Sequence, residues 1–231
     1  MNEPDVRIYP SADTALDAAS EYVLSWVGAD ARPFHLALAG GSTPRGLYER
    51  LASAGADWGH VHFWWGDERC VPPSDDASNF KMAWVSLLSS LLPASDRVHR
   101  IAGETGPREA ASRYLTELNT ELPGAPVFDL VLLGVGEDGH TASLFPGGRE
   151  LRDPAWVVAT QSPVPPVDRV SLGLSVLRAS RRTVVLATGS PKAKPVAAAL
   201  RGSTILPVAL TRPVDGEWVW FLDAEAAGKL V

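Results

Sequence analysis

The stretch FDLVLLGVGEDGHTASLFPG, from Phe128 to Gly147, decides how the rest of the chain is interpreted. It opens with a short apolar run, Phe128 to Leu133, which predicts a central strand covered on both faces. A glycine-rich segment follows, in which the backbone can turn sharply and a ligand can come close. Ligands of open α/β sheets bind beyond the carboxyl ends of the strands. The sequence therefore places His140, which lies in this segment, at a candidate site.

His140 admits two interpretations. Histidine has an ordinary pKa near 6.5, so an imidazole at a strand end suits general-base catalysis. The alternative is a loop histidine that caps Thr141 and the turn after it. Glu137 and Asp138 stand in the same loop, and a loop so rich in glycine and charge favours chemistry over packing.

Length and composition predict one globular domain covering residues 1–231. Hydrophobic residues make up 45% and charged residues 21% of the chain, close to the average for soluble proteins. A formal net charge of −6, with no block of lysine and arginine, argues against nucleic acid as a partner. An anionic ligand would therefore need a local cluster of positive charge.

The N-terminal segment MNEPDVRIYP has no apolar core flanked by basic residues, so we expect no signal peptide. No stretch of the sequence predicts a membrane span. Cys70 is the only cysteine, which excludes an intramolecular disulfide. We therefore expect a cytoplasmic protein.

Apolar runs alternate with helical patterns along most of the chain, which predicts an α/β fold. The expected strands are Val6–Tyr9, Phe34–Ala39, His60–Trp65, Phe128–Leu133, Trp156–Thr160, Val170–Leu174, Thr183–Ala187 and Trp218–Leu222. The expected helices are Ala12–Val27, Arg45–Ala54, Asn79–Leu92, Pro107–Leu122, one ending near Leu200, and Ala224–Leu230.

The junction between the second strand and its helix reads GGSTP from Gly40 to Pro44. Thr43 is predicted to cap the helix and Pro44 to be its first residue. A glycine turn entering a helix directs unpaired amides and two hydroxyls at one spot, which suits an anion. The alternative is a capped helix start without a ligand. The spacing is neither a dinucleotide fingerprint nor a P-loop.

Asp67, Glu68 and Arg69 follow the third strand. Three charged residues in a row are costly to desolvate unless they meet a substrate or each other. The alternative is a solvated turn with an Asp67–Arg69 ion pair. His60 and His62 could share one strand face, but no further ligands are close in sequence, so no metal site is expected.

Two later segments carry cations. A proline-rich loop precedes Arg169, and a glycine turn at Gly189 leads into a helix with Lys192 near its start. Like the first turn, this one leads into a helix N-terminus that could bind an anion, and here a lysine adds a positive charge. Pro195 complicates that helix: either its first turn is broken or the helix begins at Pro195.

Several motifs together resemble the 6-phosphogluconolactonase family, nearly throughout the chain and in order. They are AGGSTPRGLYERLA (Ala39 to Ala52), WGDERCVPPSDDASNFKMA (Trp65 to Ala83), GVGEDGHTASLFPG (Gly134 to Gly147), the arginine in PVDRVSL, and TGSPKAK. The resemblance implies a doubly wound, mostly parallel sheet with helices on both faces, and no cofactor. It also implies hydrolysis of 6-phosphoglucono-δ-lactone in the pentose phosphate pathway. We expect a monomer or small homo-oligomer.

The resemblance also assigns roles to residues. His140 would be the base and Arg69 would lie at the substrate. The phosphate would be held by Gly41, Ser42, Thr43 and Lys192. Apart from the resemblance, the proline-rich loop is expected to bring Arg169 to the phosphate as a further cation. Asp67 and Asp138 are expected to orient Arg69 and His140 or to bind sugar hydroxyls.

Two rival functions remain open at this point. A sugar-phosphate isomerase or deaminase would use the same phosphate loop, but its DGH motif is followed by an Asn-Glu-Pro stretch, whereas Ser143 to Gly147 reads SLFPG. A non-catalytic sugar-phosphate sensor would not need His140, and no helix-turn-helix segment is attached.

Overall fold

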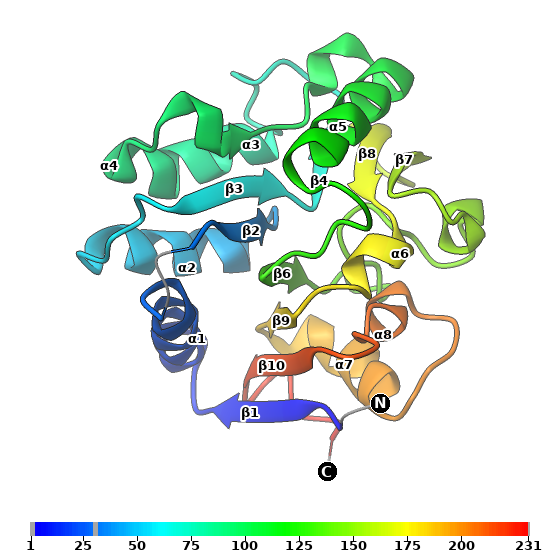
Figure 1. Ribbon diagram of the computed structural model, residues 1–231. Coiled ribbons are helices and arrows are strands. Elements are labelled where there is room, and N and C mark those ends of the chain that lie inside the picture. Colours follow the sequence, from blue (N-terminus) through cyan, green and yellow to red (C-terminus); the bar gives the residue numbers. More distant parts are fainter. Residues whose placement is uncertain (1–2, 30–31, 231) are drawn as a thin grey trace.

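The computed structural model describes residues 3–29 and 32–230, so Met1 and Asn2 of the N-terminal segment lie outside the described residues. Among the described residues, seven strands form one sheet in the order β1-β10-β9-β6-β2-β3-β5, and all neighbouring pairs are parallel. They are β1 (Asp5–Tyr9), β2 (Phe34–Leu38), β3 (Val61–Trp65), β5 (Val98–His99), β6 (Leu130–Gly134), β9 (Arg182–Ala187) and β10 (Glu217–Asp223). Figure 1 shows most of them stacked from β3 near the top to β1 near the bottom.

The middle of this sheet is covered on both faces, as the continuous apolar runs predict. All five residues of β2 are buried, and successive strand residues point to opposite faces. β6, the strand after which His140 follows, has three strands on each side. The expectation of a doubly wound, mostly parallel α/β fold is confirmed.

A second sheet of three antiparallel strands adjoins the first, in the order β4-β8-β7. Its strands are β4 (Asp67–Arg69), β7 (Val157–Gln161) and β8 (Asp168–Leu172). At Gly66 the chain leaves β3 for this sheet, where the Gly66 amide donates to Leu38 O at 2.8 Å and its carbonyl accepts from the Leu172 amide at 2.8 Å. The charged segment Asp67 to Arg69 is thus a strand and not the solvated turn.

The helices are α1 (Ala12–Val27), α2 (Ser42–Ser53), α3 (Asn79–Ala83), α4 (Ser89–Leu91), α5 (Pro107–Glu121), α6 (Leu174–Leu177), α7 (Ala193–Leu200) and α8 (Pro207–Leu210). Helices α1 and α2 contact each other, and α1 also contacts β10. Helix α5 packs against β7 and β8 of the second sheet (Figure 1). None of the described helices is long and apolar enough to cross a membrane.

Several predicted details are wrong. The helix expected over Asn79–Leu92 is interrupted by a π-helical turn at Trp84–Leu88, in which Trp84 is 40% exposed. The C-terminal segment expected as a helix forms turns. The cap of α2 is Gly41 and not Thr43, with a φ of +105° that favours glycine.

The expected conflict at Pro195 is resolved by a short 3₁₀ turn at Ser190–Lys192 before α7. Pro195 then lies in the first turn of α7, where a missing N–H costs no intrahelical bond.

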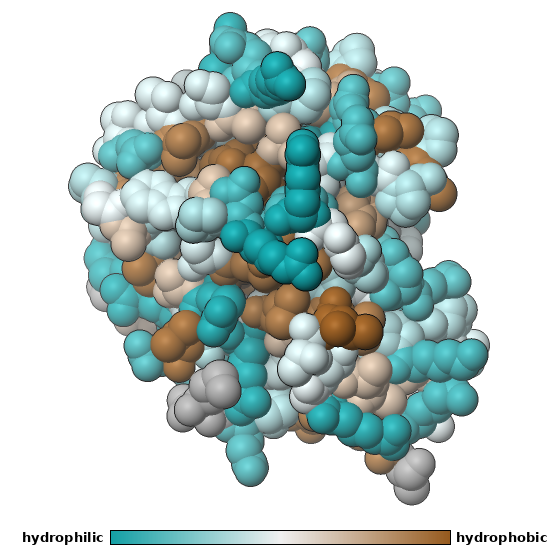
Figure 2. Space-filling view, turned by 90° about the vertical axis from the view of Figure 1, so that its right-hand side faces the viewer, coloured by the Kyte–Doolittle hydropathy of each residue, from teal (hydrophilic) through white to brown (hydrophobic). Residues whose placement is uncertain are grey.

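The outer surface mixes residue types. On the face drawn in Figure 2, hydrophobic residues lie in several patches separated by hydrophilic side chains.

Candidate active site

All nine residues singled out from the sequence line one cavity of about 660 Å³. They come from five segments that are distant in sequence: the start of α2, strand β4, the loop after β6, strand β8, and the turn after β9. The segments after β2, β6 and β9 meet because the carboxyl ends of parallel strands share one edge of a sheet, and β4 continues from the carboxyl end of β3. Arg169 is brought in by the antiparallel pairing of β8 with β4. The residues are Gly41, Ser42, Thr43, Asp67, Arg69, Asp138, His140, Arg169 and Lys192.

His140 is held by Asp138, two residues earlier. The carboxylate oxygen Oδ1 of Asp138 lies 2.6 Å from His140 Nδ1 and 3.0 Å from the His140 amide. If Nδ1 carries the proton and donates it to this carboxylate, Nε2 is left as the basic nitrogen. Burial raises the pKa of Asp138, but the hydrogen bonds from His140 outweigh it and the pKa is lowered.

The backbone fits closely around this pair. A Cβ added at Gly136 would collide with the ring of His140 at Nδ1, and it would lie 2.7 Å from Asp138 Oδ1. The Gly136 amide also donates to the His140 carbonyl at 2.8 Å. The loop therefore needs a residue without a side chain at this position. The ring of Phe145, five residues later, packs against the His140 ring, with the two centroids 5.0 Å apart.

Asp67 is a buried residue with two neutral donors, and it is only 5% exposed. Its Oδ2 accepts from the Ser143 hydroxyl at 2.5 Å and its Oδ1 from the Asn79 side chain at 3.2 Å. The carboxylate of Asp67 therefore bonds to Ser143 and Asn79 in place of the Asp67–Arg69 ion pair that the sequence left open. Because Ser143 belongs to the His140 loop, Asp67 connects strand β4 to that loop.

Glu68 and Asn79 are structural residues of the site that sequence reasoning missed. The two Glu68 carboxylate oxygens accept hydrogen bonds from backbone amides at the start of α3, one from Asn79 and one from Phe80, at 2.7 Å each. Burial raises the pKa of Glu68 despite these bonds. The Asn79 side chain lies against Gly40, where an added Cβ would overlap it. A signal was present in the run Ser78–Asn79, which is typical of a helix N-terminus.

Arg69 and Arg169 lie directly opposite each other in the pairing of β4 with β8. Burial and the charge of Arg69 lower the pKa of Arg169. Arg169 Nε donates to Pro166 O at 2.7 Å, and Arg69 Nη1 donates to Ala77 O at 2.6 Å. Arg69 Nε is buried with no acceptor among the described residues. Like charges facing each other are destabilising, so this pair favours an anionic ligand in the cavity.

The two glycine turns meet, as predicted, but they offer different groups. Thr43 Oγ1 lies 3.0 Å from Thr188 Oγ1, which brings the α2 start beside the β9 loop. The first amides of α2 have no intrahelical acceptor and can serve an anion. In the second turn, the Gly189 amide already donates to Asp223 at 2.9 Å and the Ser190 amide to Glu225 at 3.2 Å. This turn therefore contributes Lys192 and not its amides.

Comparison with known proteins relates this arrangement to one family. The family model for glucosamine-6-phosphate isomerases/6-phosphogluconolactonases matches residues 10–220. A 6-phosphogluconolactonase from Haemophilus influenzae is 34% identical over 229 residues, covering 96% of this chain and 98% of the relative. One from Mycobacterium leprae is 36% identical over 242 residues, covering 97% and 98%.

Solved structures agree in fold. The 6-phosphogluconolactonase of Trypanosoma brucei superposes with a TM-score of 0.91 at 29% identity, covering 100% of both chains. A monomeric glucosamine-6-phosphate deaminase superposes with a TM-score of 0.84 at 21% identity, covering 97% of this chain and 99% of the deaminase. The second likeness concerns the fold alone.

Proposed function

The chain belongs to the family of glucosamine-6-phosphate isomerases and 6-phosphogluconolactonases, and we propose that it acts as a lactonase with His140 as the general base. The reaction is hydrolysis of 6-phospho-D-glucono-1,5-lactone to 6-phospho-D-gluconate, the second step of the oxidative pentose phosphate pathway. The main support for His140 as the base is the 2.6 Å contact between its Nδ1 and Asp138 Oδ1 inside the cavity.

The chemistry requires little beyond a base and a positive group. A δ-lactone is an activated ester, so water can attack its carbonyl carbon once a base takes the proton. His140 Nε2 takes that proton, and Asp138 holds the imidazole at Nδ1 and stabilises the imidazolium. Arg69 faces the oxygen that becomes negative in the tetrahedral intermediate. When the ring C–O bond breaks, the imidazolium returns the proton to the leaving oxygen.

The phosphate at the far end of the sugar takes no part in bond making, but its binding positions the lactone carbon beside the water. The cavity supports this with the α2 amides and hydroxyls at Ser42 and Thr43, and with Lys192 beside them. Arg169 extends the positive charge from Arg69 toward the same ligand. Asp67 acts as a positioning residue, since its carboxylate is engaged by Ser143 and Asn79.

The test is the His140→Ala variant. We expect kcat to fall by about 10²–10⁴-fold, the usual contribution of a general base, with KM changed little. Spontaneous lactone hydrolysis is subtracted, and circular dichroism checks the fold. A variant that keeps more than about half of the wild-type rate would assign the base to another group.

One coupled comparison separates this function from that of a deaminase. Lactone hydrolysis and ammonia release from glucosamine 6-phosphate are measured on the same preparation. We expect only the first, because SLFPG replaces the glutamate-containing stretch after His140. Ammonia release at a comparable rate would favour the isomerase or deaminase branch of the family.

The remaining expectations are part of the same proposal. Residues 1–231 form one domain, which is supported by a single hydrophobic cluster that includes core residues of both sheets. The enzyme works on a phosphorylated sugar lactone without a cofactor, as a monomer or small homo-oligomer. It acts in the cytoplasm, where a lone thiol such as Cys70 stays reduced.

A further inference from the structure

Three histidines outside the cavity lie side by side on neighbouring strands. His35 on β2 pairs with His62 on β3, and His99 on β5 pairs with Trp64, two residues beyond His62. The ring centroids of His35 and His62 are 4.8 Å apart, and those of His62 and His99 are 5.2 Å apart. None of the three lines the active-site cavity. Their clustering is not explained by the lactonase site.

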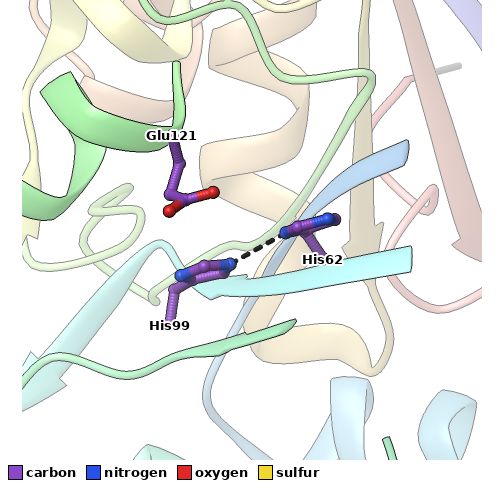
Figure 3. Close-up of side chains that lie close together, drawn as sticks. All are labelled: His62, His99 and Glu121. Carbon is purple, nitrogen blue, oxygen red and sulfur yellow. Dashed lines mark hydrogen bonds between the residues drawn. The ribbon is translucent and has the colours of Figure 1, made fainter. Parts of the chain in front are cut away.

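Two of these imidazoles face each other across β3 and β5. His62 Nδ1 lies 3.0 Å from His99 Nε2, and the carboxylate of Glu121, the last residue of α5, points toward both rings (Figure 3). One ligand atom from each of the three residues lies within 4.8 Å of the others. Glu121 is exposed, His62 is half-buried and His99 is 3% exposed. The group is therefore open to solvent on one side.

His99 is held rigidly in this position. Its ring stacks on Trp64 with centroids 3.9 Å apart and planes 13° apart. Its Nδ1 lies 2.8 Å from Glu117 Oε1 on α5. With the proton on Nδ1, the lone pair of Nε2 is directed at His62. A carboxylate behind a histidine in this way is typical of metal-binding imidazoles, because it fixes the tautomer and raises ligand basicity.

We propose that His62, His99 and Glu121 bind one zinc ion. In tetrahedral zinc sites the metal–nitrogen distance is about 2.0–2.1 Å, which places two donor atoms roughly 3.3 Å apart. The two facing nitrogens, 3.0 Å apart, are near this spacing. The His62 ring and the exposed Glu121 side chain would turn so that their donor atoms point at the same ion as His99 Nε2. Two imidazoles with a carboxylate favour zinc over magnesium or calcium, which prefer oxygen ligands only.

Binding requires a change of tautomer at His62. The hydrogen between His62 and His99 must leave Nδ1 of His62, which then carries its proton on Nε2. The ion would join β3, β5 and the end of α5. Since β5 is an edge strand of only two residues, this link would stabilise the fold.

The proposed site differs from the histidine pair that the sequence suggested. His60, which the sequence placed on one face with His62, instead contacts Val27 O through Nε2 at 3.0 Å. The second histidine ligand comes from 37 residues further along the chain. Because these residues do not line the cavity, chelation should leave kcat unchanged.

The experiment is calorimetric titration of the chelator-treated full-length protein with Zn²⁺ alone, together with thermal unfolding. We expect one saturable site. At a free Zn²⁺ concentration 100-fold above Kd, Tm should rise by about 5–10 °C. Co²⁺ serves as a spectroscopic probe, and visible absorption typical of tetrahedral nitrogen and oxygen ligation should appear. Absence of saturable binding, or no Tm change at saturation, would overturn the proposal.

Matched variants identify the ligands. Glu121→Gln changes an exposed side chain and should weaken binding at least tenfold, and His62→Gln should abolish it. Glu109→Gln, on the same helix but paired with Arg113, should bind like the wild type. His140→Ala should also bind like the wild type, because the ion is not in the cavity. Unchanged affinity in both Glu121→Gln and His62→Gln, or loss of binding in His140→Ala, would contradict the proposed site.

Discussion

At the scale of single residues, the contact between Asp138 and His140 decides which imidazole nitrogen can act as a base. Asp138 is partly exposed, yet its pKa is lowered because the hydrogen bonds from His140 outweigh the effect of burial. The carboxylate thus stays ionised below the ordinary range of aspartate, and its favourable interaction is lost only as the pH falls through the lowered pKa. Throughout the neutral range it holds the Nδ1 proton of His140.

Replacing Asp138 by asparagine removes the charge but keeps the size. We expect Asp138→Asn to lower kcat by about 10²–10⁴-fold, because an amide can hydrogen-bond the wrong tautomer and cannot stabilise an imidazolium. KM should change less than kcat. Steady-state kinetics across the neutral range test this, and a kcat within about twofold of the wild type would mean that Asp138 has no part in orienting the base.

Lys192 and Lys194 form a matched pair on the same segment. Lys192 lines the cavity, whereas Lys194 is exposed and does not. Lys192→Ala should lose about tenfold to a hundredfold in kcat/KM with the phosphorylated lactone, the value of one charge-assisted contact. With unphosphorylated glucono-δ-lactone, which the wild type should hydrolyse poorly, it should lose little. Lys194→Ala is the control and should behave like the wild type on both. Equal losses on both lactones would move the phosphate away from Lys192.

At the scale of elements, the loop after β6 positions the base through close packing of backbone against side chain. Gly136 lies so near the His140 ring that no Cβ fits between them. The same loop is tied to β4 through Ser143 and Asp67. The position of His140 therefore depends on a glycine within the loop and on a buried hydrogen bond to a neighbouring element.

Adding one methyl group tests this arrangement. Gly136→Ala should displace the imidazole and lower kcat by about 10²-fold, since small misplacements of a catalytic group have effects of this order. Gly28→Ala, at the end of α1, is the control, because its added Cβ meets only Leu24 O at 3.4 Å. Kinetics and Tm are measured for both. A Gly136→Ala enzyme with wild-type kcat would show that the loop adjusts without cost.

At the scale of the whole molecule, the buried histidine of β2 makes stability depend on pH. Burial, and then the nearby His62, lower the pKa of His35 to about 4. Between pH 6.5 and 4 the unfolded chain binds a proton there that the folded chain does not, so the free energy of unfolding falls as the pH drops. At 1.36 kcal/mol per pH unit, a change from 6.5 to about 4 is worth about 3 kcal/mol.

His35→Gln should remove most of this dependence. Glutamine still offers an acceptor to Trp64 Nε1, which lies 3.1 Å from His35 Nδ1. Denaturant unfolding with EDTA present, at several pH values between 6.5 and 4, should show a loss of stability that is smaller in the variant than in the wild type. Parallel curves for the two proteins would mean that His35 is not the group responsible.

The α/β class, the central strand and several cavity residues could be predicted from the sequence. These features depend on local signals: apolar runs long enough for strands, glycines directly after them, and cations in the following loops. The carboxyl ends of parallel strands meet at one edge, so such signals predict residues that lie together even when they are distant in sequence. His140 and Lys192, on separate loops, were found in this way.

Which polar groups pair with each other follows only from the three-dimensional packing. The Ser143 hydroxyl donates to Asp67, 76 residues away in sequence, and the Gly189 amide donates to Asp223, 34 residues away. His62 and His99, 37 residues apart, share a hydrogen bond. No periodicity or motif encodes these pairs, because each arises when packed elements bring two buried polar groups within reach and burial then requires them to be satisfied. For that reason the cavity could be predicted from the sequence, whereas the role of Asp67, the closed amides at Gly189 and the histidine cluster could not.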